Sequence, residues 1–423
     1  MDLKVRLSLG LAAGCLAAAC TPVSSHELEE PSTRRGSSAR LALPGAEPLL
    51  LSDDGLSTVL DPADGEVGAR LRNAVVARDG HTAFGSTIDR GRTTLRTVNL
   101  VSGRTLDRTE MDGRFVASVA SGSGRLVALT EPKAEGVTPW LPAGRSRTQL
   151  VVASPSTGEV RRLRLRGNFE PEAFSTDDRR MFVIEYMPAL APSHYSVRRL
   201  NLETGRVRDI ARLKQLAPRV MRGTGRMQVL DPAGDLLYTL YTQQGPGYSH
   251  GEAPGDRTTP RAFVHVLNLE EGWAHCIDLP HPFGSERATA SALAISPDGS
   301  RLYVSEWTNG AIAVIDPRSL KVLRTVSRVL GSVDDRTFAE VGSDGSLYLA
   351  GNSEVVSLDG STLDVLERWT MDRFVSGLAV SADASRVHVA IPRRLMTLDA
   401  ATGEWIGRAA IQGAPTVRAL TSL

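Results

Sequence analysis

The residues best suited to chemistry in this 423-residue chain are histidines and a glutamate that lie between apolar stretches. His194, His250, His281 and Glu252 carry side chains that bind zinc and similar metal ions. None of them stands at the spacing of a metal-ligand pair, such as two histidines one helical turn apart. The spacing predicts no metal site unless separate connections converge, and we expect no metal and no cofactor.

Aromatic residues accompany these histidines, and the combination suits a binding surface. Aromatic anchors with a few polar groups are typical of such surfaces. The candidate ligand-binding residues are Trp140, Tyr186, His194, Tyr195, Tyr248, His250 and His281. The aromatic side chains would be apolar anchors, and His250 a polar or pH-sensitive contact. Long surface connections also carry stray aromatic residues without any function, and this alternative stays open.

No catalytic residue is predicted. The chain has no glycine-rich phosphate loop and no Cys-x-x-Cys-His haem attachment sequence. Its formal net charge of +1 gives no overall field to attract nucleic acid or an anionic surface. We therefore expect no nucleic-acid partner.

The elements that must position these residues are short strands. Residues 292–326 contain four period-two apolar runs, and the turn cluster Ser296-Pro297-Asp298-Gly299 follows the first of them. This pattern predicts antiparallel strands a to d at 292–296, 302–305, 311–316 and 322–326. The Asp-Gly pair suits the a–b turn, so its chemistry is explained without a calcium site.

The same unit recurs along the chain. Second strands begin at Leu49, Thr82, Leu126, Met181, Leu236, Leu302, Leu347 and Val387. Their spacing runs from 33 residues (Leu49 to Thr82) to 66 residues (Leu236 to Leu302). A four-stranded sheet cannot bury both faces alone, so such copies must stack on one another.

At Tyr303-Val304-Ser305 through Asn309, followed by 312–316, the chain resembles a YVTN-type β-propeller repeat. The match is good in this unit and degraded in the others. The resemblance implies an all-β propeller of four-stranded blades over residues 46–423 and says almost nothing about function.

The count of second strands favours eight blades, and seven would follow if a degenerate unit is misread. The first unit, near Leu49 to Leu71, has no convincing strand a, whereas residues 416–421 resemble a strand a with nothing after it. We therefore expect the C-terminal strand to complete the N-terminal blade and close the ring, which removes an open sheet edge.

Three blades depart from the repeat in the same b–c connection. Extra residues fall at 131–148, 186–195 and 243–261 in blades three, four and five. In an up-and-down blade the b–c and d–a connections emerge on one face. The insertions, together with the long d–a segments 211–223 and 280–289, should therefore form one rim.

The N-terminus predicts export. A short basic segment precedes an apolar run from Leu7 to Ala19, which is too short for a permanent membrane span. The sequence before Cys20 resembles a bacterial lipobox, with an ordinary signal peptide as the alternative. We expect a signal peptide at 1–19, lipidation at Cys20, a flexible tether at 20–45 and one propeller domain at 46–423. Cys276 then has no disulfide partner and is expected to be a buried, inert thiol.

Three functions remain open. The leading hypothesis is a non-catalytic, monomeric propeller, lipid-anchored in the cell envelope, that binds a protein, peptide or glycan on the rim. The alternatives are a propeller enzyme of the lactonase or dehydrogenase type, with a site at the channel mouth, and a scaffold in envelope assembly. The inner strands read mostly as Val, Ala, Ser and Gly, which favours a plain channel over a charged catalytic one.

Overall fold

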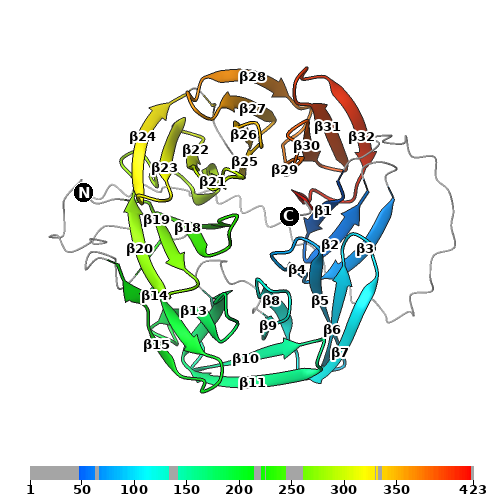
Figure 1. Cartoon of the computed structure of the whole chain (residues 1–423), viewed down its shortest axis with the longest axis vertical. Coiled ribbons are helices and arrows are strands. Elements are labelled where there is room, and N and C mark those ends of the chain that lie inside the picture. Colours follow the sequence, from blue (N-terminus) through cyan, green and yellow to red (C-terminus); the bar gives the residue numbers. More distant parts are fainter. Residues whose placement is uncertain are drawn as a thin grey trace, which may run out of the picture. The chain divides into compact units, whose positions relative to one another are not determined.

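The computed structural model describes residues 47–61, 66–132, 142–213, 221–223, 225–243, 261–328, 330–331 and 336–420. Residues 47–420 of this set form eight antiparallel sheets arranged in a ring, which is a β-propeller (Figure 1). The expected all-β fold and the count of eight four-stranded blades are confirmed. Within the described residues, the 3-10 turn η1 (Ala288–Ala290) is the one helical element.

The four regular strands of a blade run in chain order from the inner to the outer edge. Blade one is the exception, because its inner strand comes from the C-terminal end of the described chain. Blade one contains β33 (Thr416–Ala419), β1 (Leu49–Asp53), β2 (Leu56–Leu60) and β3 (Val67–Arg72). Blade two contains β4 (Val75–Val76), β5 (Thr82–Asp89), β6 (Arg92–Asn99) and β7 (Thr105–Asp112). Blade three contains β8 (Val116–Ala120), β9 (Val127–Thr130), β10 (Arg147–Ser154) and β11 (Glu159–Arg166). Blade four contains β12 (Asn168–Phe174), β13 (Arg180–Met187), β14 (His194–Asn201) and β15 (Val207–Asp209).

The second half of the ring follows the same order. Blade five contains β17 (Gly225–Leu230), β18 (Leu236–Thr242), β19 (Phe263–Asn268) and β20 (Trp273–Asp278), with β16 (Ala211–Arg212) added outside β20. Blade six contains β21 (Ser291–Ile295), β22 (Leu302–Glu306), β23 (Ala311–Asp316) and β24 (Lys321–Ser327). Blade seven contains β25 (Thr337–Val341), β26 (Ser346–Gly351), β27 (Glu354–Asp359) and β28 (Val365–Thr370). Blade eight contains β29 (Gly377–Val380), β30 (Arg386–Ile391), β31 (Arg394–Asp399) and β32 (Trp405–Ala410).

The a–b turns repeat one hydrogen-bond pattern. In blade six the hydroxyl of Ser296 donates to Asp298 Oδ1 at 2.6 Å, and the backbone N–H of Arg301 donates to Ser296 Oγ at 2.9 Å. Serine and aspartate side chains that bind nearby backbone in this way are typical of tight turns. The hydrogen bond from Ser296, together with those from Ser300, lowers the pKa of Asp298 to about 2. The Asp298 carboxylate therefore closes a hairpin, as its position in the sequence predicts.

The core is divided into eight clusters, one between each pair of neighbouring blades. Each blade contributes apolar side chains to the cluster on either of its faces. The b strand of blade six shows this, because Tyr303 packs toward blade seven while Val304 packs toward blade five. Alternation along a strand thus places successive residues in different cores.

Ring closure by the C-terminal strand is also confirmed. β33 pairs antiparallel with β1, with Val417 opposite Leu51, and the N–H of Leu420 donates to Pro48 O at 2.9 Å. Val417 belongs to the cluster between blades eight and one, and Leu420 to the cluster between blades one and two. One short strand therefore supports two blade interfaces.

Blade four corrects the expectation of a ten-residue insertion at 186–195. β13 and β14 continue as a paired hairpin through Tyr186 opposite Tyr195 and Met187 opposite His194. Four of these ten residues therefore lengthen the strands, because the period-two apolar pattern continues through both tyrosines, and residues 188–193 form the connection.

Blade four also has a short outer strand. β15 covers three residues, whereas β11 of blade three covers eight. After Asp209 the chain leaves blade four, and Ala211 and Arg212 pair in parallel with Trp273 and Ala274 of blade five. The segment expected to be a plain d–a connection thus contains a strand.

Within the described residues, no helix has the length and apolar character needed to cross a bilayer.

Removal of residues 414–423 is expected to destabilise the ring strongly. Loss of burial should cost about 1.5–3 kcal/mol for each of Val417 and Leu420, against a typical total stability of about 5–15 kcal/mol. Thermal unfolding of the truncated and full chains measures the effect. The full chain with a short added C-terminal tail is the control, and equal melting temperatures for truncated and full chains would contradict the closing role of β33.

Candidate functional site

The predicted rim residues do not share one environment. Trp140, Tyr248 and His250 lie outside the described residues. Tyr186 and Tyr195 are 1% and 4% exposed, and their ring centroids lie 5.8 Å apart. Both belong to the core between blades four and five. Their hydroxyls are used within the protein, since they donate to Glu170 Oε2 at 3.0 Å and to Arg222 O at 3.2 Å.

The two described histidines of the predicted site lie in different blades. His194 is half-buried at the start of β14, and its Nδ1 is 3.1 Å from Ser193 Oγ. His281 is exposed in the connection from β20 to β21. No group of three or more His, Cys, Asp or Glu side chains that could hold a metal ion is found in the part of the chain that the structure describes.

Cys276 is a free thiol in β20 and is half-buried. Its sulfur packs against the cluster between blades four and five. Burial raises the pKa of the thiol well above its usual value, so the neutral, unreactive form prevails at neutral pH.

The connections on the b–c face of blades three and four are joined by hydrogen bonds. The backbone N–H of Arg145 donates to Ala189 O at 2.9 Å, and its side-chain Nε donates to Asn168 Oδ1 at 2.9 Å. Asn168 in turn donates to Ala143 O at 3.0 Å and to Ala189 O at 3.3 Å. Burial lowers the pKa of Arg145, and nearby Glu170 opposes that shift. The end of the blade-three insertion is therefore held against blade four.

Hydrogen bonds also link the connections of blades four, five and six on this face. Tyr195 and Met221 exchange two backbone hydrogen bonds of 2.9 and 2.7 Å, which connect blade four to the segment that leads into blade five. Gln243, at the start of the blade-five insertion, donates to Glu286 O at 3.0 Å in the connection that leads into blade six. Blades three to six thus carry a laterally connected set of loop ends.

A buried carboxylate fixes the next connection. Glu306 is fully buried and accepts hydrogen bonds of 2.6 Å from the N–H of Gly284 and from Asn309 Nδ2. Burial raises the pKa of Glu306, while these hydrogen bonds oppose the rise. Glu306 and Asn309, which lie in the most regular repeat, therefore hold the β20–β21 connection in place.

The inner strands carry charged residues that the sequence analysis underrated. Glu172 on β12 accepts a 2.6 Å hydrogen bond from Gln228 on β17, which joins the inner edges of blades four and five. Glu340 on β25 is influenced by the charge of Arg418 on β33, although blade eight lies between their blades. The charge of Arg418 on the inner strand of blade one thus partly offsets the rise in the pKa of Glu340 on the inner strand of blade seven.

One end of the channel is crossed by a side chain. Arg78, in the a–b turn of blade two, donates to Pro232 O at 3.1 Å in the a–b turn of blade five. The two turns belong to blades separated by two others. Arg78 therefore spans the a–b end of the channel, opposite to the face that carries the insertions.

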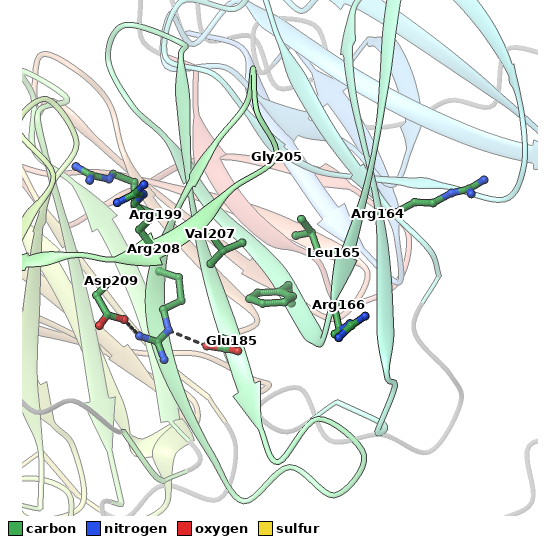
Figure 2. Close-up of a pocket in the computed structure, with 11 residues that line it drawn as sticks. Arg164, Leu165, Arg166, Glu185, Arg199, Gly205, Val207, Arg208 and Asp209 are labelled. Carbon is green, nitrogen blue, oxygen red and sulfur yellow. Dashed lines mark hydrogen bonds and ion pairs between the residues drawn. The ribbon is translucent and has the colours of Figure 1, made fainter.

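A cleft of about 780 Å³ lies between the outer parts of blades three and four (Figure 2). It exists because β15 is too short to cover the flank of β11. The residues that line it are Arg164, Leu165, Arg166, Phe169, Glu185, Arg198, Arg199, Gly205, Val207, Arg208 and Asp209. Leu165, Phe169 and Val207 provide its apolar part, and arginines surround them.

The position of Phe169 in this cleft is set by a turn. Gly167 has φ +124°, and a Cβ at this position would lie 2.7 Å from Phe169 Cε2. Thr148 Oγ1 donates to Gly167 O at 2.8 Å and accepts from the Phe169 N–H at 2.9 Å. The equivalent residues Gly113, Phe115 and Thr93 repeat this arrangement in the preceding blade.

Charge in the cleft is arranged around Arg198. Its Nε lies 2.7 Å from Glu185 Oε2, and its guanidinium also pairs with Asp209. Figure 2 places Arg164 on one side of the cleft, extending away from it, with Arg199 and Arg208 on the other. Both carboxylates of the cleft are thus engaged by Arg198, whereas Arg164 extends away from the cleft and Arg199 lies near Gly272 of blade five.

One sequence pattern bears on catalysis and was missed. Gly247-Tyr248-Ser249-His250-Gly251 matches Gly-x-Ser-x-Gly, which in α/β-hydrolases places a serine between a strand and a helix. The segment lies outside the described residues, and the described residues contain no α-helix to follow such a turn. The pattern alone therefore assigns no nucleophile.

Comparison with known proteins supports the fold alone. No protein-family model matches the sequence, and no curated protein matches it. The structure of apo AztD from Citrobacter koseri is similar at 13% identity, covering 88% of this chain and 97% of that chain with a TM-score of 0.55. Dihydro-haem d1 dehydrogenase NirN in complex with DHE is similar at 15% identity, covering 92% and 78% with a TM-score of 0.52.

The Glu340 carboxyl is expected to make stability pH-dependent. Burial raises its pKa from 4.5 to about 7, so between these values the folded chain holds a proton that the unfolded chain has released. Stability should therefore fall as pH rises from about 4.5 to 7. Glu340→Gln should leave stability unchanged near pH 4 and raise it at pH 8, on the order of 1–3 kcal/mol.

Urea unfolding of both proteins at several pH values measures this effect. Glu354→Gln, a change at the start of β27 in the same blade, serves as the control. An identical pH dependence in the wild type and Glu340→Gln would contradict a raised pKa for Glu340.

Proposed function

We propose that this protein is a non-catalytic binding propeller, exported to the bacterial cell envelope and held there by a lipid on Cys20. Its ligand is a protein, peptide or glycan, and it binds on the b–c face of blades three to five. The single observation that carries the proposal is the lateral connection of this face. The loop ends at Arg145, Ala189, Tyr195 and Gln243 are linked to their neighbours by hydrogen bonds.

A binding surface benefits from such connections because they fix the loop ends before the ligand arrives. Loops that are already ordered in the free protein lose less conformational entropy when the ligand binds. Insertions in consecutive blades, held at their ends, therefore provide an extended surface on a rigid support. The buried Tyr186 and Tyr195 serve this support, which leaves Trp140, Tyr248, His250, His194 and His281 as the proposed contacts.

A second candidate is a catalytic site in the channel, of the lactonase or dehydrogenase type. Glu340 and Arg418 favour it, because a carboxylate with a pKa of about 7 suits acid–base chemistry at neutral pH. Arg78 crosses the a–b end, so a substrate would enter from the face that carries the insertions. The binding role is preferred because the hydrogen bonds between neighbouring loop ends lie on the face that carries the insertions.

Replacement of residues 243–261 by an Asn-Gly hairpin tests the binding role. The insertion lies outside the repeat, so the shortened chain should fold with a similar melting temperature. We expect loss of the partner that wild-type protein retains from solubilised envelope, identified by mass spectrometry and then measured in purified form. Glu203→Ala with Arg206→Ala, in the c–d turn of blade four on the opposite face, is the matched control. Unchanged affinity of the shortened chain would move the site elsewhere.

Cys20→Ser tests the anchor. Several acyl chains hold a protein firmly at about 0.8 kcal/mol per buried methylene, whereas a single chain binds only marginally. The variant should leave the membrane fraction or stay unprocessed, as fractionation and intact mass will record. Cys15→Ser is the matched control, because Leu11-Ala12-Ala13-Gly14-Cys15 is a second lipobox-like run that precedes the one at Cys20. Unchanged fractionation and mass for Cys20→Ser would contradict lipidation.

A further inference from the structure

We propose that the flank of blade three that faces blade two binds a linear anionic polysaccharide. The site is a strip of exposed arginines on the two outer strands of this blade, Arg147 on β10 and Arg162, Arg164 and Arg166 on β11. These residues are called the arginine strip. The strip lies on the outside of the ring and does not depend on the function proposed above.

Alternation along the two strands places the whole arginine strip on one face. Val151 of β10 and Val160 of β11 pack in the cluster between blades two and three, whereas Leu163 and Leu165 pack in the cluster between blades three and four. β10 and β11 pair without a shift in register, so the arginine strip shares the face of the two valines. Figure 2 agrees, because Arg164 extends away from the cleft between blades three and four.

The strip places like charges next to one another. Arg147 lies directly opposite Arg166 in the ladder, and Arg164 is two residues from Arg166 on β11. Like charges directly opposite each other destabilise a sheet, and residues two apart on a strand are separated by only about 6.7 Å. Within the described part of the chain, no ion pair or hydrogen bond engages the side chains of Arg147, Arg164 and Arg166. An anionic ligand would relieve this repulsion.

The preceding blade carries acids where the strip has arginines. The two blades align through the Gly-x-Phe turn that follows each outer strand, so Asp112 of blade two corresponds to Arg166, and Glu110 to Arg164. Arg92 lies 3.3 Å from Asp112 and 3.9 Å from Glu110, which neutralises this face of blade two. The repeat itself therefore does not require arginines at these positions, and blade three has gained charge there.

One arginine of the strip is held by blade two. The guanidinium carbon of Arg162 lies 5.3 Å from the centroid of the Phe115 ring, and the side chain donates a hydrogen bond to Asp112 O. A guanidinium held in this way has lost part of its freedom before a ligand arrives. Arg162 is thus the fixed end of the strip, and the other three arginines continue from it toward the b–c face.

The chemistry of this face favours an anionic polysaccharide over other anionic partners. Guanidinium groups bind sulfate, phosphate and carboxylate through paired N–H donors, and Gln149, opposite Arg164, offers an amide to sugar hydroxyls. Among the described residues of this face no exposed aromatic ring is available to stack on a nucleic-acid base, since Phe115 is 3% exposed and lies under Arg162. Val151 is fully buried, so it offers no anchor to a peptide. The row along β11 is straight, which suits a linear chain with repeated anionic groups.

The test uses the full chain and a fluorescently labelled heparin hexasaccharide, a linear sulfated glycan, measured by anisotropy. We expect saturable binding with an affinity that falls as salt rises. Unlabelled competitors are an oligothymidylate of similar length, a glutamate-rich peptide, and vesicles that contain phosphatidylglycerol. Each of them should compete at least about tenfold less well than the unlabelled hexasaccharide.

Variants locate the binding. Arg164→Gln with Arg166→Gln should weaken hexasaccharide binding about tenfold and make its salt dependence shallower. Gln149→Leu should weaken binding about two- to fivefold, because it removes the amide and keeps the size of the side chain. Arg108→Gln with Arg408→Gln is the matched control, because it removes the same charge from exposed positions on the outer strands of blades two and eight.

Stability distinguishes a binding role from a structural one. Arg166→Gln removes the like-charge pair with Arg147, so it should raise the melting temperature while it weakens binding. An arginine that served the fold would lower the melting temperature when replaced. The chain shortened at 243–261 should keep its affinity for the hexasaccharide, which separates the arginine strip from the b–c face.

Several outcomes would overturn the proposal. They are the absence of hexasaccharide binding up to about 1 mM, an equal loss of affinity in the control pair, and a lower melting temperature of Arg166→Gln with unchanged affinity. Tighter binding of the oligothymidylate, the peptide or the vesicles through Arg164 and Arg166 would also overturn it, and would assign the strip to that class of partner.

Discussion

Every blade of this ring has two apolar faces, and only the neighbouring blades can bury them. Tyr303 and Val304 are adjacent in sequence yet pack in different interfaces, so no blade has a core of its own. Eight clusters therefore depend on one another around the ring. Pairing of β33 with β1 completes this set, because Val417 and Leu420 contribute to the interfaces on either side of blade one.

This dependence determines where the chain can vary. Inner and middle strands contribute to two interfaces at once, so a change there disturbs both neighbours. The connections and the outer strands have one free side and are less constrained. The departures from the regular repeat follow this rule. The insertions, whose ends include Arg145 and Gln243, are connections on one face. The chain leaves blade four for blade five after Asp209, at the outer edge of the ring.

The sequence was sufficient to predict the repeat, the eight blades and the closure, because each depends on local alternation and turn residues. Ser296 and Asp298 form the turn that their order suggests. The same alternation continues through Tyr186 and Tyr195, which were predicted to lie in a loop. The strands extend to both residues, and this places both rings in the core.

Other features of the candidate sites had weaker signals. Glu172 lies just upstream of the most recognisable part of its inner strand, and the influence of Arg418 on Glu340 joins blades that a single repeat does not contain. Nothing local in the sequence indicates that the chain leaves blade four after Asp209 and adds a strand to blade five. Pairing of Ala211 with Trp273 joins residues far apart in sequence, and such a contact follows only from the assembled ring.

The exchange of the outer strand has a physical consequence that explains the cleft. A full outer strand in blade four would cover Val207 and the flank of Leu165, as the longer β11 covers its own blade. Its early departure leaves Val207 half-buried and shortens the hydrogen-bonded ladder, both of which are locally unfavourable. Pairing of Ala211 and Arg212 with blade five restores only part of the ladder. Local departures of this kind are expected at functional surfaces, where stability and local regularity give way to access for a partner.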